Sequence, residues 1–245
     1  LRFGRNLGEY DWLGLNYRYE QTTVSDVAAE NVTPFLFNQF RTTSRISPSF
    51  IHDTRDDFLN PSNGWRHVVR FEIAGGILGG LDFHRTNYEV TYYHPIFQKL
   101  VGAIHVETNY ADGYNGTILP IFERYFMGGA NSLRGYTIRN VGPKNANGDP
   151  LGGTQTLLMN FEAQYPFTKS LRGILFYDRG NVYGTGPDIS GTSENFEFGN
   201  MRQSVGTGIR FISPFGPIGV SYGVKTDRRD GERVGEFHFS AGSSF

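Results

Sequence analysis

Hydrophobic and polar side chains alternate along several stretches of the chain, most clearly near its end. Phe237 and Phe239 share one parity, while Glu236 and His238 share the other. The same division recurs in four earlier segments, at 68–73, 100–107, 204–211 and 218–225. A repeat of two residues is typical of a β-strand whose two faces meet different surroundings. The pattern therefore predicts an all-β, antiparallel protein.

We predict about ten strands, and their lengths indicate that they cross a membrane. They lie at about 11–24, 42–57, 65–76, 82–96, 99–112, 154–166, 171–183, 201–213, 217–226 and 235–245, with a partial strand at 1–7. Most exceed the roughly five or six residues of an average soluble strand and reach the roughly 9–11 that a tilted strand needs to cross a bilayer. No run approaches about 18 apolar residues, so a membrane-spanning helix is not predicted.

The connections between strands alternate between short and long, and the long ones fall at 25–41, 113–153 and 184–200. Transmembrane barrels have short periplasmic turns on one side and long loops on the other. The strand positions that we predict to face inward carry glycine and serine together with arginine, glutamate and lysine. This suits a hydrated lumen better than the interior of a soluble β-sandwich, which is the alternative on pattern alone. The candidates for interfacial aromatic girdles are Tyr92, Tyr93, Tyr165 and Phe167.

The composition narrows the possible functions. The chain has 32 glycines, 15% aromatic and 38% hydrophobic residues, which suits strands and turns in a single domain. It has no cysteine, so disulfides, thiolate metal sites and thiol nucleophiles are excluded. A formal net charge of -1 creates no field that favours nucleic acid. The residues that follow Leu1 do not form a targeting signal, so we expect any such segment to have been removed or to lie upstream.

Enzymatic chemistry is not predicted. The six histidines are scattered without a metal-ligand spacing, and neither a GxSxG elbow nor a nucleotide-binding loop is present. The acidic stretch DTRDD lacks the spacing of a calcium loop. We interpret Asp53, Arg55, Asp56 and Asp57 as a charged turn that binds to itself and keeps the next strand in register. We therefore expect no catalytic residue, metal or cofactor; an outer-membrane hydrolase is the remote alternative.

Several longer motifs follow one another across almost the whole chain. They are DTRDDFLNPSNGW (53–65), MGGANSLRGY (127–136) with NVGPK (140–144), FYDRGNVY (176–183), SVGTGIRFISPFGPIGVSYG (204–223) and FHFSAGSSF (237–245). In content and order they resemble the landmarks of the BamA family of outer-membrane insertases. The resemblance is closer to this family than to its relatives in two-partner secretion or autotransporter assembly.

The resemblance implies a barrel of about sixteen strands, preceded by periplasmic POTRA domains, that assists folding and insertion of β-barrel proteins into the bacterial outer membrane. Residues 1–245 would form the C-terminal portion of that transmembrane barrel, with the POTRA domains outside this chain, or would close as a smaller barrel. The implied partners are unfolded outer-membrane β-barrel clients, the lipid bilayer and, in the full-length protein, accessory lipoproteins and periplasmic chaperones. A secretion translocator or pore of the same superfamily is the alternative function.

In that family a loop bearing an arginine folds back into the lumen. The resemblance assigns this lumenal loop motif to Leu133, Arg134, Gly135 and Tyr136, and the glycines that let the backbone turn to Gly128 and Gly129. An inward loop held by its arginine would also block a passive pore. The alternative is a solvated arginine in an ordinary glycine-rich loop.

The resemblance also implies two wall carboxylates that anchor Arg134, at Glu162 and Asp178. The alternation supports Glu162 independently, because the neighbours of the same parity at 160 and 164 are polar. Asp178 is less clear, because its parity includes Phe176 and Val182. A guanidinium can bind carboxylates bidentately, which a lysine cannot do, so this pairing would hold the loop in one place.

The last predicted strand contains two further candidates. Gly242 would weaken the strand and permit a kink, which by resemblance marks a lateral gate where the barrel seam opens to client strands. The alternative is a glycine that fits a crowded lumen. Phe245 fits a C-terminal assembly signal, by which the chain would itself be a client, or an interfacial anchor.

Overall fold

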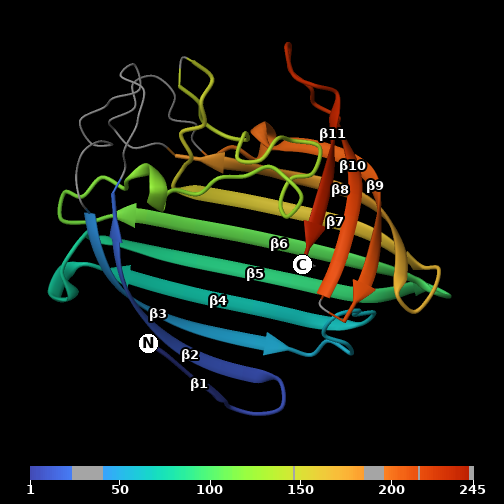
Figure 1. The fold of residues 1–245 in the computed structure, drawn as a ribbon, viewed down its shortest axis with the longest axis horizontal. Helices are drawn as coiled ribbons and strands as arrows, with labels where there is room; N and C mark the ends of the chain where they lie inside the picture. The colour runs from blue at the N-terminus through green and yellow to red at the C-terminus, as the bar shows by residue number, and fades with distance from the viewer. Residues whose placement is uncertain (24–40, 146, 185–195, 215, 243–245) are drawn as a thin grey trace.

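The computed structural model describes residues 1–23, 41–145, 147–184, 196–214 and 216–242, and in these ranges the predicted all-β fold is confirmed. Eleven strands form a single antiparallel sheet in chain order (Figure 1). They are β1 (Arg2–Asn6), β2 (Asp11–Thr22), β3 (Arg41–Asp53), β4 (Gly64–Ala74), β5 (Phe83–Phe97), β6 (Leu100–Gly113), β7 (Gln155–Pro166), β8 (Leu171–Tyr183), β9 (Arg202–Ser213), β10 (Gly216–Lys225) and β11 (Gly235–Ala241). Short 3₁₀ turns lie at η2 (Gly76–Leu78), η3 (Ile121–Glu123) and η4 (Phe198–Asn200). Within the described ranges, no helix is long and apolar enough to span a bilayer.

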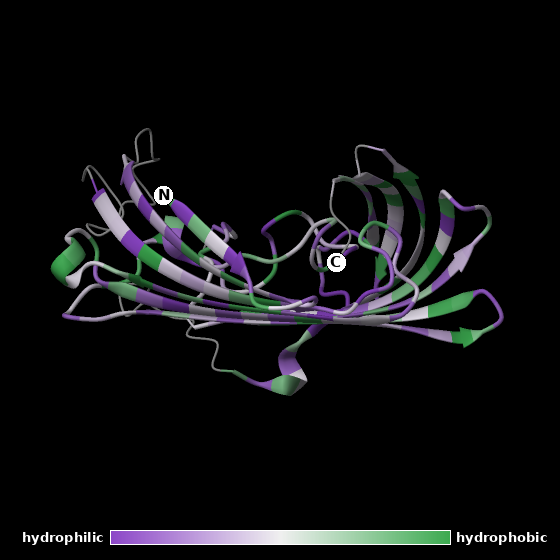
Figure 2. Ribbon diagram, turned by 90° about the horizontal axis from the view of Figure 1, so that it is seen from below, coloured by the Kyte–Doolittle hydropathy of each residue, from purple (hydrophilic) through white to green (hydrophobic). Residues whose placement is uncertain are grey.

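The sheet curves into a trough that is open between its two edge strands (Figure 2). Each inner strand pairs with its two neighbours in sequence, while β1 and β11 pair on one side only in the described part of the chain. The partial strand predicted at 1–7 is β1, which pairs with β2 from Arg2 opposite Asn16 to Asn6 opposite Trp12. The described strands thus form an open sheet and not a smaller closed barrel.

The two faces of the sheet differ as the alternation predicts. On β11, Phe237 is 77% and Phe239 68% exposed, while His238 between them is only 8% exposed. On β9, Ile209 and Phe211 are likewise exposed on the convex face. Successive side chains on a strand point to opposite faces, so the exposed band is apolar and the concave side is polar. This distribution is that of a transmembrane barrel wall.

Aromatic rings gather on the convex face near the β5–β6 and β7–β8 turns. Trp65 and Tyr92 stack with their ring centroids 4.0 Å apart, and Tyr165 packs edge-on against Phe167 at 5.6 Å. The prediction that Tyr93 belongs to this girdle is wrong. Tyr93 follows Tyr92 directly and therefore points to the concave side, where it is 1% exposed.

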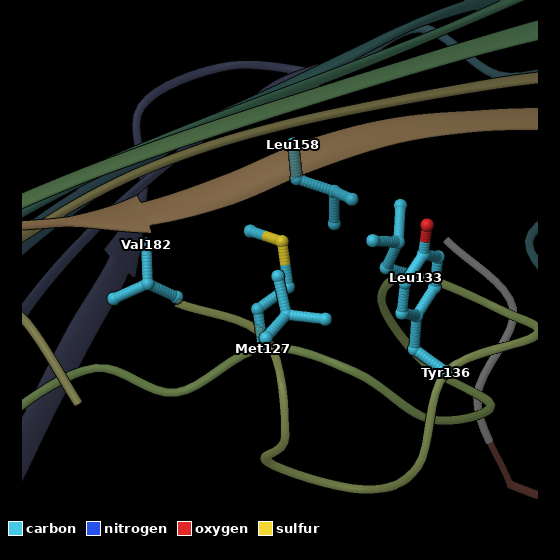
Figure 3. Packing of buried hydrophobic residues seen from close by; sticks show 6 residues of the cluster. Met127, Leu133, Tyr136, Leu158 and Val182 are labelled. Atoms are coloured by element: carbon cyan, nitrogen blue, oxygen red, sulfur yellow. The ribbon is translucent and has the colours of Figure 1, made fainter. Parts of the chain in front are cut away.

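The described part of the long β6–β7 connection, residues 114–145 and 147–154, lies inside the trough and contributes to two clusters of buried apolar side chains. Met127, Leu133 and Tyr136 of this connection pack against Leu158 of β7 and Val182 of β8 (Figure 3). A second cluster joins Leu119 to residues of β4, β5 and β6 at Ala74, Phe83 and Ala111. Apolar residues of this loop therefore pack directly against the concave face of the sheet. We call residues 114–154 the lumenal loop.

The charged β3–β4 turn does bind to itself, as predicted. Arg55 donates through Nε and Nη2 to the carboxylate of Asp53, at 2.8 and 2.7 Å. Asp57 accepts from the backbone amide of Asn60 at 2.7 Å, and Asp56 accepts from the amide of Ser62 at 2.8 Å. These bonds give the turn one conformation between two paired strands.

Candidate functional site

The glycine-rich turn of the lumenal loop is closed by short-range hydrogen bonds. The Gly128 amide donates to the Ser132 hydroxyl at 3.0 Å, and the Gly129 amide donates to the Leu133 carbonyl at 3.2 Å. Gly128 has a φ of 115°, and a Cβ there would lie 2.3 Å from the Thr137 carbonyl oxygen. Only glycine fits this position. The turn presents the next residues, from Leu133 onward, to the wall.

Arg134 reaches both wall carboxylates. Its Nε and Nη2 donate to the two oxygens of Asp178 at 2.8 and 2.7 Å, and its Nη1 donates to Glu162 at 2.6 Å. The backbone amide of Arg134 adds a bond to Asp178 at 3.1 Å. The Glu162 and Asp178 side chains are fully buried. One guanidinium thus ties the loop to β7 and β8 together.

The charges around Arg134 are balanced. Arg210 of β9 donates to the second oxygen of Glu162 at 3.3 Å, so two cations face two carboxylates. Burial alone would lower the pKa of Arg134, but the two carboxylates outweigh burial and raise its pKa above the ordinary value. Such pairing is required when charges leave water, because an isolated buried charge is very costly.

The apolar residues that share the parity of Asp178 are part of the same site. The Arg134 guanidinium carbon lies 3.6 Å from the centre of the Phe176 ring, a cation–π geometry. Val182 packs in the cluster around Leu133, which is itself 0% exposed. Arg179, on the other parity, donates to the Phe198 carbonyl at 2.8 Å. The parity of Asp178 is therefore the lumenal one, and the loop covers its apolar members.

Gly135 and Tyr136 connect the motif to later strands. Gly135 has a φ of 85°, and a Cβ there would lie 2.9 Å from the Gly223 carbonyl carbon, so the two backbones are in direct contact. The Tyr136 hydroxyl donates to the Gln203 carbonyl at 2.9 Å and also lies within hydrogen-bond distance of Asp227. Burial raises the pKa of Tyr136, and the bond to Asp227 adds to this rise.

The loop also contacts the last strand, which the sequence did not indicate. The Gly135 amide donates to His238 Nε2 at 2.8 Å, and the Thr137 hydroxyl donates to Glu236. Both acceptors lie on β11. Their position on the polar parity of the strand placed them in the lumen but did not name their partner.

Strand β11 ends at Ala241, and the backbone leaves the strand conformation at Gly242, where φ is 83°. The Gly242 amide still donates to the Pro217 carbonyl at 2.8 Å. Among the described residues, no heavy atom outside its chain neighbours lies within 4 Å of a Cβ built at Gly242. Among the described residues, conformation and not space therefore requires glycine here, while the lateral-gate interpretation and its lumen alternative both stay predictions. Phe245 lies outside the described residues, so its role stays a prediction.

The sequence patterns did not predict a second ion cluster, which joins the loop to strands β3 and β5. Glu123 sits between Arg45 of β3 and Arg85 of β5, and its carboxylate accepts from Arg45 Nη2 at 2.8 Å. The available signal was weak: Glu123 and Arg124 are charged residues inside the otherwise apolar and aromatic run 121–126. The sequence could not show that both are buried.

Comparison with known proteins gives a consistent result. The Omp85 superfamily domain matches residues 1–245. The chain is 30% identical to the outer membrane protein assembly factor BamA of Nitratidesulfovibrio vulgaris, over 100% of this chain and 31% of that protein. It is 26% identical to the protein of the same name from Neisseria meningitidis serogroup B, over 78% of this chain and 27% of that protein. It is also 26% identical to the sorting and assembly machinery component 50 homolog of Bos taurus, over 82% of this chain and 45% of that protein.

The fold is also similar to a solved structure. The crystal structure of BamA from Haemophilus ducreyi lacking POTRA domains 1-3 matches 97% of this chain and 52% of that one, with a TM-score of 0.76 and 18% sequence identity. This chain therefore spans about a third or less of the two bacterial relatives compared above and about half of that crystallised chain.

Proposed function

The chain belongs to the Omp85 superfamily, and from this premise we propose that it is the C-terminal part of the barrel of an outer-membrane assembly factor. In this role it assists β-barrel proteins to fold and insert into the bacterial outer membrane. The observation that carries the proposal is the lumenal loop fastened by Arg134 to Glu162 and Asp178 inside a sheet with an apolar convex face. A loop held in this way occupies the lumen and is compatible with assembly at the wall.

The proposed mechanism is strand addition at the edge formed by β11. In the described residues β11 pairs only with β10, so its other edge presents backbone donors and acceptors. An unfolded client strand can pair with such groups, which provide affinity without regard to sequence. Gly242 ends the regular strand at the point where the seam would part. The lateral gate in this mechanism consists of β11, which ends at Ala241 directly before Gly242, and the first strand of the complete barrel.

The partners follow from this mechanism. The clients are unfolded outer-membrane β-barrel proteins, and the convex face contacts lipid. Accessory lipoproteins and periplasmic chaperones would act with the full-length protein through segments outside residues 1–245. No residue is assigned a catalytic role, and no cofactor or nucleic acid is part of the mechanism.

Insertion of a client barrel into liposomes by the full-length protein tests this function. We expect folded client to accumulate faster with the protein than without it, and more slowly when Arg134→Ala frees the loop. Planar-bilayer conductance distinguishes the alternative pore. Large steady openings together with no acceleration of client folding would favour a translocator or pore of the same superfamily and reject the assembly function.

A further inference from the structure

The lumenal loop is held at a second place, by an ion cluster that joins Glu123 to two arginines of the wall. Arg45 Nη2 and Nη1 approach the two carboxylate oxygens of Glu123 at 2.8 and 3.3 Å, which is a bidentate contact. Arg85 Nη2 donates to the Glu123 carboxylate and to its backbone carbonyl. Glu123 is 4% and Arg45 5% exposed. We call Glu123, Arg45 and Arg85 the Glu123 clamp.

A wall residue, Glu72, also contacts both arginines. Glu72 of β4 accepts from Arg45 Nη1 at 3.1 Å and from the Ser47 hydroxyl at 2.8 Å. Glu72 also lies 3.7 Å from Arg85 Nη1. Because β4 runs between β3 and β5, Glu123 lies above Glu72 and joins two strands that do not pair with each other. The clamp therefore places one loop carboxylate between two wall arginines that Glu72 also contacts.

Apolar groups shield the clamp from water. Glu123 ends the 3₁₀ turn η3, whose Glu123 amide donates to the Pro120 carbonyl at 2.9 Å. The guanidinium carbons of Arg45 and Arg85 lie 5.4 and 5.2 Å from the centre of the Phe83 ring, within the cluster that contains Leu119. A buried carboxylate in such surroundings needs its cations, because loss of one partner leaves an uncompensated charge.

The loop carries opposite charges at its two anchors, Arg134 and Glu123. At Arg134 the loop provides the cation and strands β7 and β8 provide the carboxylates. At Glu123 the loop provides the carboxylate and strands β3 and β5 provide the cations. A loop that docked in the reverse direction would bring Arg134 to the wall arginines and Glu123 to the wall carboxylates, and these like charges disfavour that arrangement. The pair of anchors thus determines both where the loop lies and in which direction it runs across the trough.

We propose that Glu123 is a positioning residue of the assembly function, which sets the lumenal loop in register against β3 and β5 so that Arg134 meets its carboxylates. This inference rests on the proposed function for its biological consequence, but the positioning itself can be measured separately. Loss of the clamp releases the part of the loop around Glu123. It also weakens the contact of Arg134 with Glu162 and Asp178, since both sites belong to one connection.

The experiment uses the full-length protein in nanodiscs, in a cysteine-free background that carries Leu119→Cys as a reporter. Leu119 is 4% exposed next to the clamp, so reaction with a polar maleimide reports opening of this part of the loop. We expect Glu123→Gln to raise the labelling rate at least about tenfold, because the arginines lose their central carboxylate. Arg45→Gln should raise it as well, and the double variant should label no faster than the faster single variant.

The matched control is Glu89→Gln, which breaks a lumenal ion pair with Arg66 at 2.5 Å between β4 and β5, a pair that includes no residue of the Glu123 clamp. It should leave labelling unchanged, and a heat-modifiability gel shift should show that every variant has a folded barrel. Glu123→Asp, which keeps the carboxylate between Arg45 and Arg85, should retain more protection than Glu123→Gln, which a merely structural perturbation would not do.

The two hypotheses fail differently. Unchanged labelling in Glu123→Gln, or additive effects of Glu123→Gln and Arg45→Gln, would overturn the clamp whatever happens to client insertion. Faster labelling together with an unchanged insertion rate would overturn the positioning role in assembly. If the wild-type protein inserts no client at all, the proposed function fails, while the labelling result still decides whether the clamp holds the loop.

Discussion

The backbone amide of Gly135 donates a hydrogen bond to His238 Nε2 at 2.8 Å, and this bond connects the lumenal loop to the last strand of the sheet. It lies next to the Arg134 anchor, so the loop contacts the wall at β7 and β8 and the edge strand β11 through consecutive residues. Movement of β11 away from β10 therefore acts directly on the loop.

Removal of the acceptor should release the Gly135 amide. His238→Leu leaves this buried donor without a partner, which costs about 1–3 kcal/mol. We expect hydrogen–deuterium exchange at Gly135 to accelerate by about tenfold or more in this variant. His238→Gln, whose side-chain carbonyl can accept the bond, is the matched control. Equal exchange rates in the wild type and His238→Leu would show that the bond does not restrain the loop.

Loss of the Arg134 guanidinium should loosen the loop strongly. Arg134→Ala leaves Glu162 and Asp178 buried with, among the described residues, only Arg210 still ion-paired to either of them, and breaking a buried pair typically costs about 3–5 kcal/mol. Protease should then cut the loop faster, and client insertion should slow. The exchange of Arg134→Asp with Asp178→Arg should restore part of both. Protease resistance equal to the wild type in the single variant would contradict the tether.

A methyl group at Gly135 should disrupt the contact between loop and β10. Gly135→Ala combines a left-handed backbone with a Cβ 2.9 Å from the Gly223 carbonyl carbon, so we expect a loss of about 1–3 kcal/mol. The heat-modifiability midpoint of the barrel measures this loss. Gly116→Ala has a similar φ of 75° but no described atom within 4 Å of its Cβ, so it isolates the backbone term. A midpoint no lower in Gly135→Ala than in Gly116→Ala would rule out the close approach.

The β3–β4 turn should loosen in acid. Burial raises the pKa of Asp56, but hydrogen bonds from Ser62 and Asn63 outweigh burial and lower its pKa below the ordinary value of about 3.9. A lowered pKa means that the carboxylate stabilises the turn above about pH 4, and that this contribution is lost as the pH falls through the lower, folded-state value. Amide exchange at Ser62 and Asn63, corrected for its intrinsic pH dependence, should rise in this window. Asp56→Asn should abolish the pH dependence, and a pH-dependent rise that persists in Asp56→Asn would assign it to another group.

A lock across the seam should stop assembly if clients enter there. A disulfide between β11 and the first strand of the complete barrel keeps the edge paired, so we expect client insertion to cease and to return on reduction. The control is a disulfide between Val220→Cys and Phe239→Cys, which lie opposite each other on strands that are already paired. Normal insertion by the seam-locked protein would remove the lateral gate from the mechanism.

Much of the fold could be predicted because a strand has a repeat of two residues. Alternation alone identified the lipid-facing side chains of β9 and β11, and the edges of nearly all strands lie within a few residues of their predicted positions. The family resemblance is confirmed by the Omp85 superfamily domain over residues 1–245. The error at Tyr93 came from placing two consecutive residues in the same girdle, which a strand does not allow.

The candidate site was only partly predictable. Parity placed Glu162 in the lumen, but Phe176 and Val182 made the parity of Asp178 ambiguous, since apolar residues on an inner face are stable only when something covers them. Here the lumenal loop covers them, and Phe176 receives the Arg134 guanidinium. A local pattern does not contain this information, because the covering residues are more than 40 positions away in the chain.

By itself, the sequence determined the class of fold, the lipid-facing surface of the sheet and the arginine that enters the lumen, because each depends on local order or on motifs. Only the tertiary structure decided which charges meet. Arg45 and Glu123 are 78 positions apart, and Gly135 and His238 are 103 positions apart. Alternation predicts that a side chain points inward. It does not predict which inward charge that side chain contacts, since the contact depends on the curvature of the sheet and the path of the loop across it.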